Sequence, residues 1–376
     1  MNQGPYPGVW LPGDDPGQRR FAVLQTGGDH GFSLEGGGHL PEVTVAYEVW
    51  GELDAARSNG VLVLHALTGD SHAFGPAGPG HGLVGWWDGL VGPGAPIDTN
   101  RYFVVCPNVL GGCYGTTGPA SKAQDGRLYG SRFPVVTIRD QVDVEVALAD
   151  SLGIDTWAAV IGGSMGGMRV LEWCIGQPDR VAGAVVLSVG AAASADQIAL
   201  ASLQVRAIRS DPAFRGGDYY ETDARPVDGL SLARGIGQYS YRTGAEFEDR
   251  FGRTAQDEED PLKGGRYSIE SYLQHHGEKL AQRFDPNSYI LLSEAMNHHD
   301  VGRGRGGSAD ALRRVSAEVT VAGIASDRLY PLTQQEDLAR SLPGHPAVHV
   351  IESESGHDGF LLEVDQVGQV ISAALT

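Results

Sequence analysis

The segment AAVIGGSMGGM, residues 158–168, decides the fold of this chain. Its first four residues are an apolar run typical of a strand, its end opens a predicted helix, and GGSMG at 162–166 matches G-x-S-x-G. In so sharp a strand-to-helix turn, side chains two residues before and after the serine would collide, which explains a glycine at both places. The pattern predicts a nucleophile elbow with Ser164 as the nucleophile. The alternative is a glycine-rich turn with an incidental serine, because a chain with 54 glycines matches a short motif easily by chance.

Short apolar runs recur on both sides of this segment, with predicted helices between them. Continuous apolar runs are typical of strands covered on both faces in a parallel sheet, and their alternation with helices predicts an α/β fold. The predicted strands are 43–50, 61–64, 102–106, 158–161, 184–187, 319–323 and 348–351. The predicted helices that accompany them are 139–152, 168–175, 334–341 and 360–374.

The α/β pattern is interrupted over residues 190–315, which show no strand-like alternation. Helical segments predicted within this stretch include 198–210 and 231–241. Because the sheet pattern resumes afterwards, we expect one α/β core, 21–189 and 316–376, with a helical lid inserted into it. Residues 1–20 are rich in Pro, Gly and Asp, and we expect them to form a loose N-terminal extension.

Composition narrows the possible classes of protein. The 376 residues include 47 acidic and 28 basic side chains, and the net charge of −19 repels phosphate backbones, which argues against nucleic-acid binding. Three cysteines are too few for a disulfide framework and suit a reducing compartment. The start of the chain has no signal-peptide pattern, and no apolar stretch approaches the ~18 residues of a membrane span. We therefore expect a globular cytoplasmic protein without a membrane partner.

A nucleophilic serine needs a histidine as base, and the histidine needs an acid that orients it. In folds with this elbow the order along the chain is serine, acid, histidine, each after a later strand. Asp327 and His357 each follow a predicted strand, so both are expected at the same sheet edge as Ser164. Asp358 is a competing acid, but it adjoins the histidine in sequence and is expected to point elsewhere.

The oxyanion that forms during acyl transfer needs two backbone N–H donors. One comes from the residue after the nucleophile, Met165, and the other from an early junction of strand and loop. The predicted strand 61–64 runs directly into HALTG at 65–69, where the Leu67 N–H is the candidate. The alternative is an ordinary loop with a buried His65.

Two other patterns carry less weight. GRGRGG at 302–307 satisfies G-x-G-x-x-G, but the nearest strand-like run, 289–292, is separated from it by nine largely polar residues. A dinucleotide fingerprint must begin at the end of a strand, so we expect no dinucleotide site. The histidine pairs at 275–276 and 298–299 point in different directions on any regular element, and no spaced ligand set accompanies them, so no metal is expected.

Beyond the elbow, several longer motifs resemble the homoserine O-acetyltransferase family, with the actinobacterial form looking most similar. The similarity covers roughly residues 35–370. The motifs are HALTGDSH (65–72), GWWDGLVGPGAPIDT (85–99), NVLGGCYGTTGP (108–119), SRFPVVTIRDQV (131–142), GGSMGGM (162–168), HDVGRGRGG (299–307), SDRLYP (326–331) and GHDGF (356–360).

This resemblance implies an α/β-hydrolase fold, a mostly parallel sheet with an inserted helical lid, and a place in methionine biosynthesis. It also implies the same triad, Ser164, Asp327 and His357, acting through an acetyl-serine intermediate. The implied partners are L-homoserine, acetyl-CoA as co-substrate and a second copy of the chain, with no other cofactor. Substrate-contacting roles are implied for Arg234 and Asp358.

Three alternatives stay open at this stage: homoserine O-succinyltransferase of the same family, an esterase of the same fold, and a non-catalytic scaffold. The first two keep the triad and differ in acyl donor or acceptor. The scaffold requires the triad to be accidental.

Overall fold

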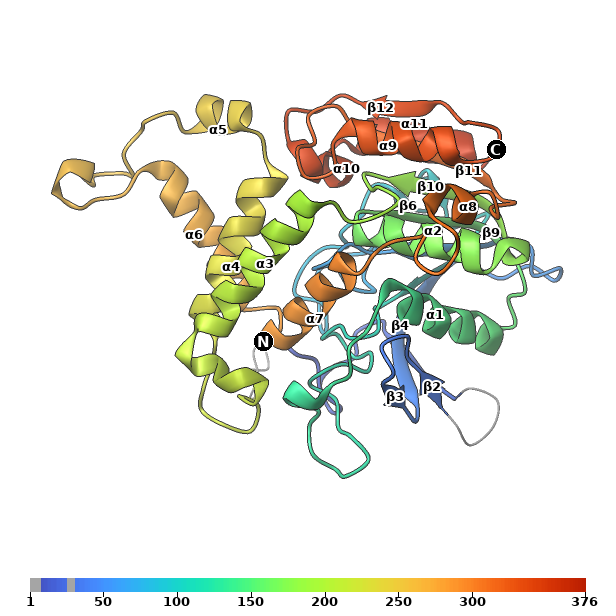
Figure 1. Ribbon diagram of the computed structural model, residues 1–376, viewed down its shortest axis with the longest axis horizontal. Helices are drawn as coiled ribbons and strands as arrows, with labels where there is room; N and C mark the ends of the chain where they lie inside the picture. The colour runs from blue at the N-terminus through green and yellow to red at the C-terminus, as the bar shows by residue number, and fades with distance from the viewer. Residues whose placement is uncertain (1–7, 26–30) are drawn as a thin grey trace.

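A computed structural model describes residues 8–25 and 31–376 (Figure 1). Its centre is an eight-stranded sheet of order β1-β4-β8-β5-β9-β10-β11-β12. From β8 to β12 every neighbouring pair is parallel, whereas β1 and β4 are antiparallel to their neighbours. The strands are β1 (Arg20–Leu24), β4 (Val43–Trp50), β5 (Gly60–Leu64), β8 (Phe103–Pro107), β9 (Trp157–Gly163), β10 (Val181–Leu187), β11 (Glu318–Ile324) and β12 (Val348–Ile351). Two short pairs, β2 (Phe32–Ser33) with β3 (His39–Leu40) and β6 (Val91–Gly92) with β7 (Ile97–Asp98), lie outside this sheet.

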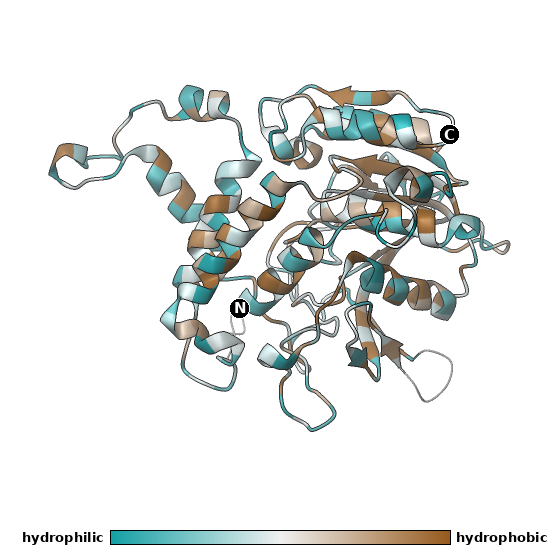
Figure 2. Ribbon diagram, in the orientation of Figure 1, coloured by the Kyte–Doolittle hydropathy of each residue, from teal (hydrophilic) through white to brown (hydrophobic). Residues whose placement is uncertain are grey.

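The central strands are buried on both faces, as their continuous apolar runs predict. In β5, Leu62 and Leu64 belong to one hydrophobic cluster, while Val61 and Val63 belong to the other. The first cluster includes side chains of α1 (Ile138–Leu152), α2 (Met165–Gly176) and α9 (Leu332–Ser341). The second includes α11 (Val364–Ala374). Figure 2 shows the hydrophobic residues gathered along the strands between these helices. The prediction of a mostly parallel sheet covered by helices on both faces is confirmed.

Between β10 and β11 the chain forms helices and no strand, all within described residues. In Figure 1 the helices α3 to α6 extend to one side of the sheet, with α4 between α3 and α6, whereas α8 lies near α2. The helices are α3 (Ala195–Ser210), α4 (Val227–Tyr241), α5 (Gly244–Arg250), α6 (Ser268–Ala281), α7 (Pro286–Asn297) and α8 (Ser308–Leu312). That residues 190–315 act as a lid domain of their own stays a prediction.

One sequence prediction about a single element is wrong, and one ambiguous run is settled. The strand-like run 289–292 lies in the helical stretch predicted over 190–315, inside α7, where Pro286 occupies the first turn and the Asp285 carboxylate accepts a hydrogen bond from the Ser288 N–H at 2.8 Å. This N-terminal capping overrides the apolar run. The helix predicted over 360–374 is two helices, α10 (Gly359–Leu362) and α11, because the backbone leaves helical geometry at Glu363.

The segment before β1 differs from the loose extension that its composition predicts. The Trp10 N–H donates to the Cys113 carbonyl at 2.9 Å, and the Trp10 ring stacks on Phe21 with centroids 4.7 Å apart. The Arg19 side chain is buried, and its Nη1 donates to the Gly80 carbonyl at 2.8 Å. Trp10 and Arg19 therefore fasten this segment to the core, although most residues between them are exposed, while residues 1–7 lie outside the described part. No described helix is long and apolar enough to cross a membrane.

Candidate active site

The nucleophile elbow joins β9 to α2, and Ser164 stands between them. Its backbone has φ 57° and ψ −125°, a conformation that residues other than glycine rarely adopt. The Ser164 N–H donates to the Leu187 carbonyl of β10, and its carbonyl accepts from the Met168 N–H in α2, both at 3.0 Å. These two bonds fix the strained residue between strand and helix, so its hydroxyl is held in one place.

Both flanking glycines are required by the same geometry. A Cβ on Gly162 would lie 2.7 Å from the backbone carbon of Gly166, well inside van der Waals contact. A Cβ on Gly166 would overlap the Leu64 carbonyl at the end of β5. The elbow therefore has no room for side chains at the two positions where the sequence places glycine.

Ser164, His357 and Asp327 lie together in one hydrogen-bonded chain. His357 Nε2 is 2.9 Å from Ser164 Oγ, and His357 Nδ1 is 2.7 Å from Asp327 Oδ2. All three residues are buried. The other carboxylate oxygen, Asp327 Oδ1, accepts the N–H groups of Leu329 at 2.8 Å and Tyr330 at 2.9 Å. With Oδ1 held by the backbone, Oδ2 is fixed toward the imidazole, which is the arrangement that orients a catalytic base.

Aromatic rings surround the imidazole and exclude water from it. The ring centroids of Tyr330, Phe360 and Tyr241 lie 5.0, 5.4 and 5.9 Å from that of His357. Burial raises the pKa of Tyr330 and of Tyr241, so both phenols are neutral. Tyr241 ends α4, so the helical insertion reaches the base directly. Sequence reasoning missed these rings, although SDRLYP and GHDGF contain two of them.

One oxyanion candidate lies in the elbow itself and the other in the turn after β5, the strand beside β9. Met165 is the first residue of α2, where backbone N–H groups have no partner inside the helix. Leu67 is in the turn after β5; the carbonyl of the preceding Ala66 accepts from the Gly69 N–H at 3.0 Å and lies 2.7 Å from His65 Nδ1. Because that carbonyl shares a planar peptide with the Leu67 N–H, fixing it aims the N–H in the opposite direction.

His65 is buried, and its ring holds this turn in place through hydrogen bonds. The Val109 N–H donates to His65 Nε2 at 3.1 Å, so the ring proton is assigned to Nδ1, which faces the Ala66 carbonyl. Burial, with the nearby Arg169 charge, lowers the pKa of His65 to about 3, so the ring stays neutral. The His65 carbonyl in turn accepts from Arg169 of α2, whose guanidinium binds Glu145 at 2.6 Å. His65 is thus buried, as that alternative states, and its contacts hold the turn that carries the oxyanion candidate Leu67.

Comparison with known proteins places this site in a family. The model of the α/β hydrolase fold matches residues 60–364. The chain is 58% identical to homoserine O-acetyltransferase of Thermobifida fusca, over 99% of this chain and 97% of that protein. It is 53% identical to homoserine O-acetyltransferase of Mycobacterium tuberculosis, over 96% and 94%. The chain belongs to the homoserine O-acetyltransferase family.

Solved structures agree with this assignment. Homoserine O-acetyltransferase from Bacillus anthracis superposes with a TM-score of 0.86 at 28% identity, covering 95% of this chain and 97% of that one. Esterase E22 gives the same TM-score and identity, covering 95% and 100%. The resemblance stated from the motifs is confirmed, and the fold is shared by acetyltransferases and esterases alike.

In this member of the family, Arg234 contacts the triad through a single aromatic ring, that of Tyr241. Its guanidinium is 5.1 Å from the centroid of the Tyr241 ring, which contacts His357, and its Nη2 donates to the neutral Gln238 side chain at 2.9 Å. Among the ion pairs of the described residues none includes Arg234. Its charge therefore remains available to an anion.

Asp358 pairs with an arginine, and the acid that contacts the imidazole is Asp327, as the sequence predicts. Asp358 Oδ2 lies 3.0 Å from Nε of Arg242, which also binds Glu246 at 3.0 Å. Sequence reasoning missed Arg242, which follows α4 directly. Asp358 is therefore half of an ion pair between the insertion and the loop that carries the base.

A small cavity of about 40 Å³ lies between α3 and α7, on the far side of the Tyr241 and Tyr330 rings that pack on His357. It is lined by Leu67, Ala193, Gln197, Leu200, Ala201, Gln204, Tyr241, Ser293, Met296, Asn297, Leu329 and Tyr330. These residues include an oxyanion candidate and two rings that pack on His357, and none of them is cationic. The cavity is suited to a small neutral group.

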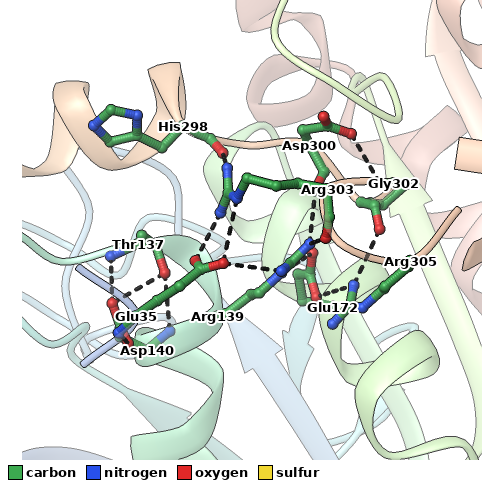
Figure 3. Close-up of polar contacts among 11 residues, drawn as sticks. Glu35, Thr137, Arg139, Asp140, Glu172, His298, Asp300, Gly302, Arg303 and Arg305 are labelled. Atoms are coloured by element: carbon green, nitrogen blue, oxygen red, sulfur yellow. Dashed lines mark hydrogen bonds and ion pairs between the residues drawn. The ribbon is translucent and has the colours of Figure 1, made fainter. Parts of the chain in front are cut away.

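The G-x-G-x-x-G loop is occupied by ion pairs, as Figure 3 shows. Arg303 binds Glu35 at 2.7 Å, and Arg305 binds Glu172 of α2 at 2.7 Å. Arg139 of α1 bridges the two carboxylates, at 2.9 Å to Glu35 and 3.3 Å to Glu172. The loop arginines are thus paired with carboxylates. These pairs hold the loop, which follows α7, against α1 and α2.

Among the described residues one group, Glu48, His72 and His81, has the spacing of a metal site. His72 Nδ1 is 2.9 Å from Glu48, while His81 Nε2 accepts the Gln18 N–H at 3.2 Å. The two imidazoles stack with centroids 3.9 Å apart and planes 13° from parallel. An ion must lie close to the plane of each imidazole that binds it, and two stacked rings share no such point. The group is a hydrogen-bonded cluster that fastens Gln18 to β4.

Proposed function

We propose that this protein transfers acetyl from acetyl-CoA to L-homoserine through an acetyl group on Ser164. The observation that carries the proposal is the chain Ser164–His357–Asp327, at 2.9 and 2.7 Å, on the elbow of a homoserine O-acetyltransferase family member. A serine activated in this way attacks acyl carbonyls.

In the first half-reaction, His357 Nε2 removes the Ser164 proton while Oγ attacks the thioester carbon. Asp327 stabilises the imidazolium that forms. The N–H groups of Leu67 and Met165 bind the oxyanion, which such donors stabilise by about 3–4 kcal/mol each. The C–S bond then breaks, His357 returns its proton to the sulfur, and coenzyme A leaves.

In the second half-reaction, the homoserine hydroxyl occupies the place that coenzyme A has left. His357 takes the hydroxyl proton, the oxygen attacks the acetyl carbon, and the same N–H groups bind the second oxyanion. When the C–O bond to Ser164 breaks, His357 gives the proton back to the serine. O-acetyl-L-homoserine and free enzyme result.

Recognition of the acceptor falls to two charges near the triad. The planar guanidinium of Arg234 suits the α-carboxylate, because it can donate two parallel hydrogen bonds. Asp358 suits the α-ammonium, which would share this carboxylate with Arg242. Both charges lie where the insertion meets the loop that carries His357. We place the entry of the acceptor there.

An acetyl donor fits the cavity better than a succinyl donor. A succinyl group ends in a carboxylate, which needs a cation when it is buried. The cavity between α3 and α7, which shares Leu67, Tyr241 and Tyr330 with the surroundings of the triad, is lined by amides, a hydroxyl, aromatic rings and apolar side chains, without a cation.

We also place the protein in the cytoplasm as a homodimer. Helices α4 and α6 carry an apolar groove that includes Leu232, 59% exposed, and Tyr239, 53% exposed. Contiguous exposed apolar surface of this kind is typical of subunit contacts. Light scattering coupled to gel filtration tests the homodimer. A monomeric mass at micromolar concentration would exclude it.

The main experiment follows labelled acetyl from acetyl-CoA with and without L-homoserine. Transfer requires homoserine and yields labelled O-acetyl-L-homoserine. An esterase releases labelled acetate at the same rate with and without homoserine. A scaffold forms no acetyl-serine at all.

A further inference from the structure

Two peptide groups connect a lid residue to the oxyanion donor Leu67. Nη1 of Arg283 donates to the Thr68 carbonyl at 2.9 Å. The same peptide group carries the Gly69 N–H, which donates to the Ala66 carbonyl at 3.0 Å. The Ala66 carbonyl belongs to the peptide group of the Leu67 N–H. Guanidinium, peptide, peptide and oxyanion donor therefore form one series.

We infer that Arg283 is a positioning residue for acyl transfer, acting on the oxyanion through the Leu67 N–H. Hydrogen-bonded groups in series polarise one another, so a cation at one end makes the N–H at the other end more positive. In a trans peptide the carbonyl and the N–H point in opposite directions, so each link also fixes the direction of the next. The inference rests on the proposed function, because it needs an oxyanion at Ser164.

The surroundings of Arg283 suit this role. Its Nη1 lies 3.2 Å from the Tyr114 hydroxyl, which itself donates to the Arg283 carbonyl. Burial raises the pKa of Tyr114, so this partner is a neutral phenol. No ion pair of the described chain includes Arg283, and Asp70 acts on it only at longer range. Its charge is therefore not cancelled by a bound carboxylate.

Arg283 also links two parts of the fold. It lies between α6 and α7, within the insertion, whereas the turn at 66–69 belongs to the α/β core. The oxyanion donor is at full strength only while the α6–α7 junction rests on this turn.

The test measures acetylation of Ser164 by acetyl-CoA in a single turnover without homoserine. Arg283→Met should slow this step by about 10- to 100-fold, less than loss of a whole oxyanion donor, with KM for acetyl-CoA within about 3-fold. Arg283→Lys keeps the cation and should recover the rate to within about 5-fold of the parent. Arg303→Met is the matched control, because it removes another lid-to-core guanidinium that does not touch the turn.

A second measurement separates positioning from loss of structure. A small alkylboronic acid forms a tetrahedral adduct with Ser164 whose oxygen takes the place of the oxyanion. Its affinity should fall in Arg283→Met by about the same factor as the rate and stay unchanged in Arg303→Met. Equal rates or equal boronate affinities in these two variants would overturn the inference.

The remaining outcomes are also decisive. If the parent protein forms no acetyl-serine, the proposed function fails before any variant is compared. If Arg283→Met does not fold, Arg283→Gln replaces it, since glutamine keeps a neutral donor. Arg283→Lys must then be faster than Arg283→Gln by about 5-fold or more, and equal rates would overturn the role of the charge.

Discussion

Replacement of Asp327 by asparagine tests the site most sharply, because the two oxygens of this carboxylate have separate duties. Oδ1 accepts two backbone N–H groups, at 2.8 and 2.9 Å, while Oδ2 faces His357 Nδ1 at 2.7 Å. In Asp327→Asn the amide oxygen keeps the two backbone bonds, so the loop is preserved. The amide NH2 must then face the imidazole. It donates to Nδ1 and drives the ring proton onto Nε2.

The expected loss follows from that tautomer. With its proton on Nε2, the imidazole cannot accept the Ser164 proton. Reversal of the tautomer in serine hydrolases costs about 10⁴-fold in kcat, or about 5.4 kcal/mol at 1.36 kcal/mol per decade. We expect acetylation of Ser164 in a single turnover to fall by about this factor. The midpoint of thermal unfolding should shift by only a few degrees, because no buried group loses its partner.

Asp358→Asn is the matched control for this prediction. It makes the same chemical change one residue after the histidine, at a carboxylate that pairs with Arg242. Acetylation should therefore stay within about 3-fold of the parent. If Asp358→Asn stopped acetylation and Asp327→Asn kept more than a tenth of it, the acid would be Asp358 and the assignment would be wrong.

Three further predictions concern the nucleophile, the acceptor and pH. Ser164→Ala should remove acetyl transfer and leave the unfolding midpoint within a few degrees; more than a trace of transfer by the purified variant would exclude Ser164 as nucleophile. Arg234→Ala and Asp358→Ala should each lower kcat/KM for homoserine by about 30- to 1000-fold and slow acetylation much less, which rapid-quench kinetics of the two half-reactions can compare. Burial lowers the pKa of His65 to about 3 and of His299 to about 4, so the unfolded chain binds more protons between pH 6.5 and these values. The free energy of unfolding should therefore fall as pH decreases from about 6.5 to 4, and urea titrations that show it constant over this range would contradict the assignment of both rings as neutral.

The sequence predicts the sheet well, because strands buried on both faces must be apolar throughout. Residues 43–50 and 348–351 form β4 and β12 with the same bounds, the other five predicted strands differ by a few residues at most, and β1 is not predicted. The same signal is ambiguous at 289–292, since a short apolar run fits a buried helix equally well, and the cap at Asp285 favours the helix.

The candidate site is predictable only in part, for a physical reason. Ser164, Asp327 and His357 each follow a strand of a parallel sheet, so chain order and topology bring them to one edge. Tyr241 and Arg242 reach the same edge from the end of α4. No periodic pattern specifies where an inserted helix docks, so their proximity to His357 and Asp358 is visible only in three dimensions.

The ion pairs of Figure 3 define what an exchange of lids between relatives would have to carry with it. Consider a chimera that keeps α1 and α2 of this protein and takes the insertion of an esterase with this fold. The loop after α7 then carries the esterase's charges. If that loop lacks arginines where Arg303 and Arg305 stand, Glu35 loses one of its two guanidinium partners and so does the buried Glu172, on the helix that begins at the nucleophile. Any recombination, natural or engineered, therefore has to exchange the insertion together with α2. This holds although more than a hundred residues of sequence separate the paired charges.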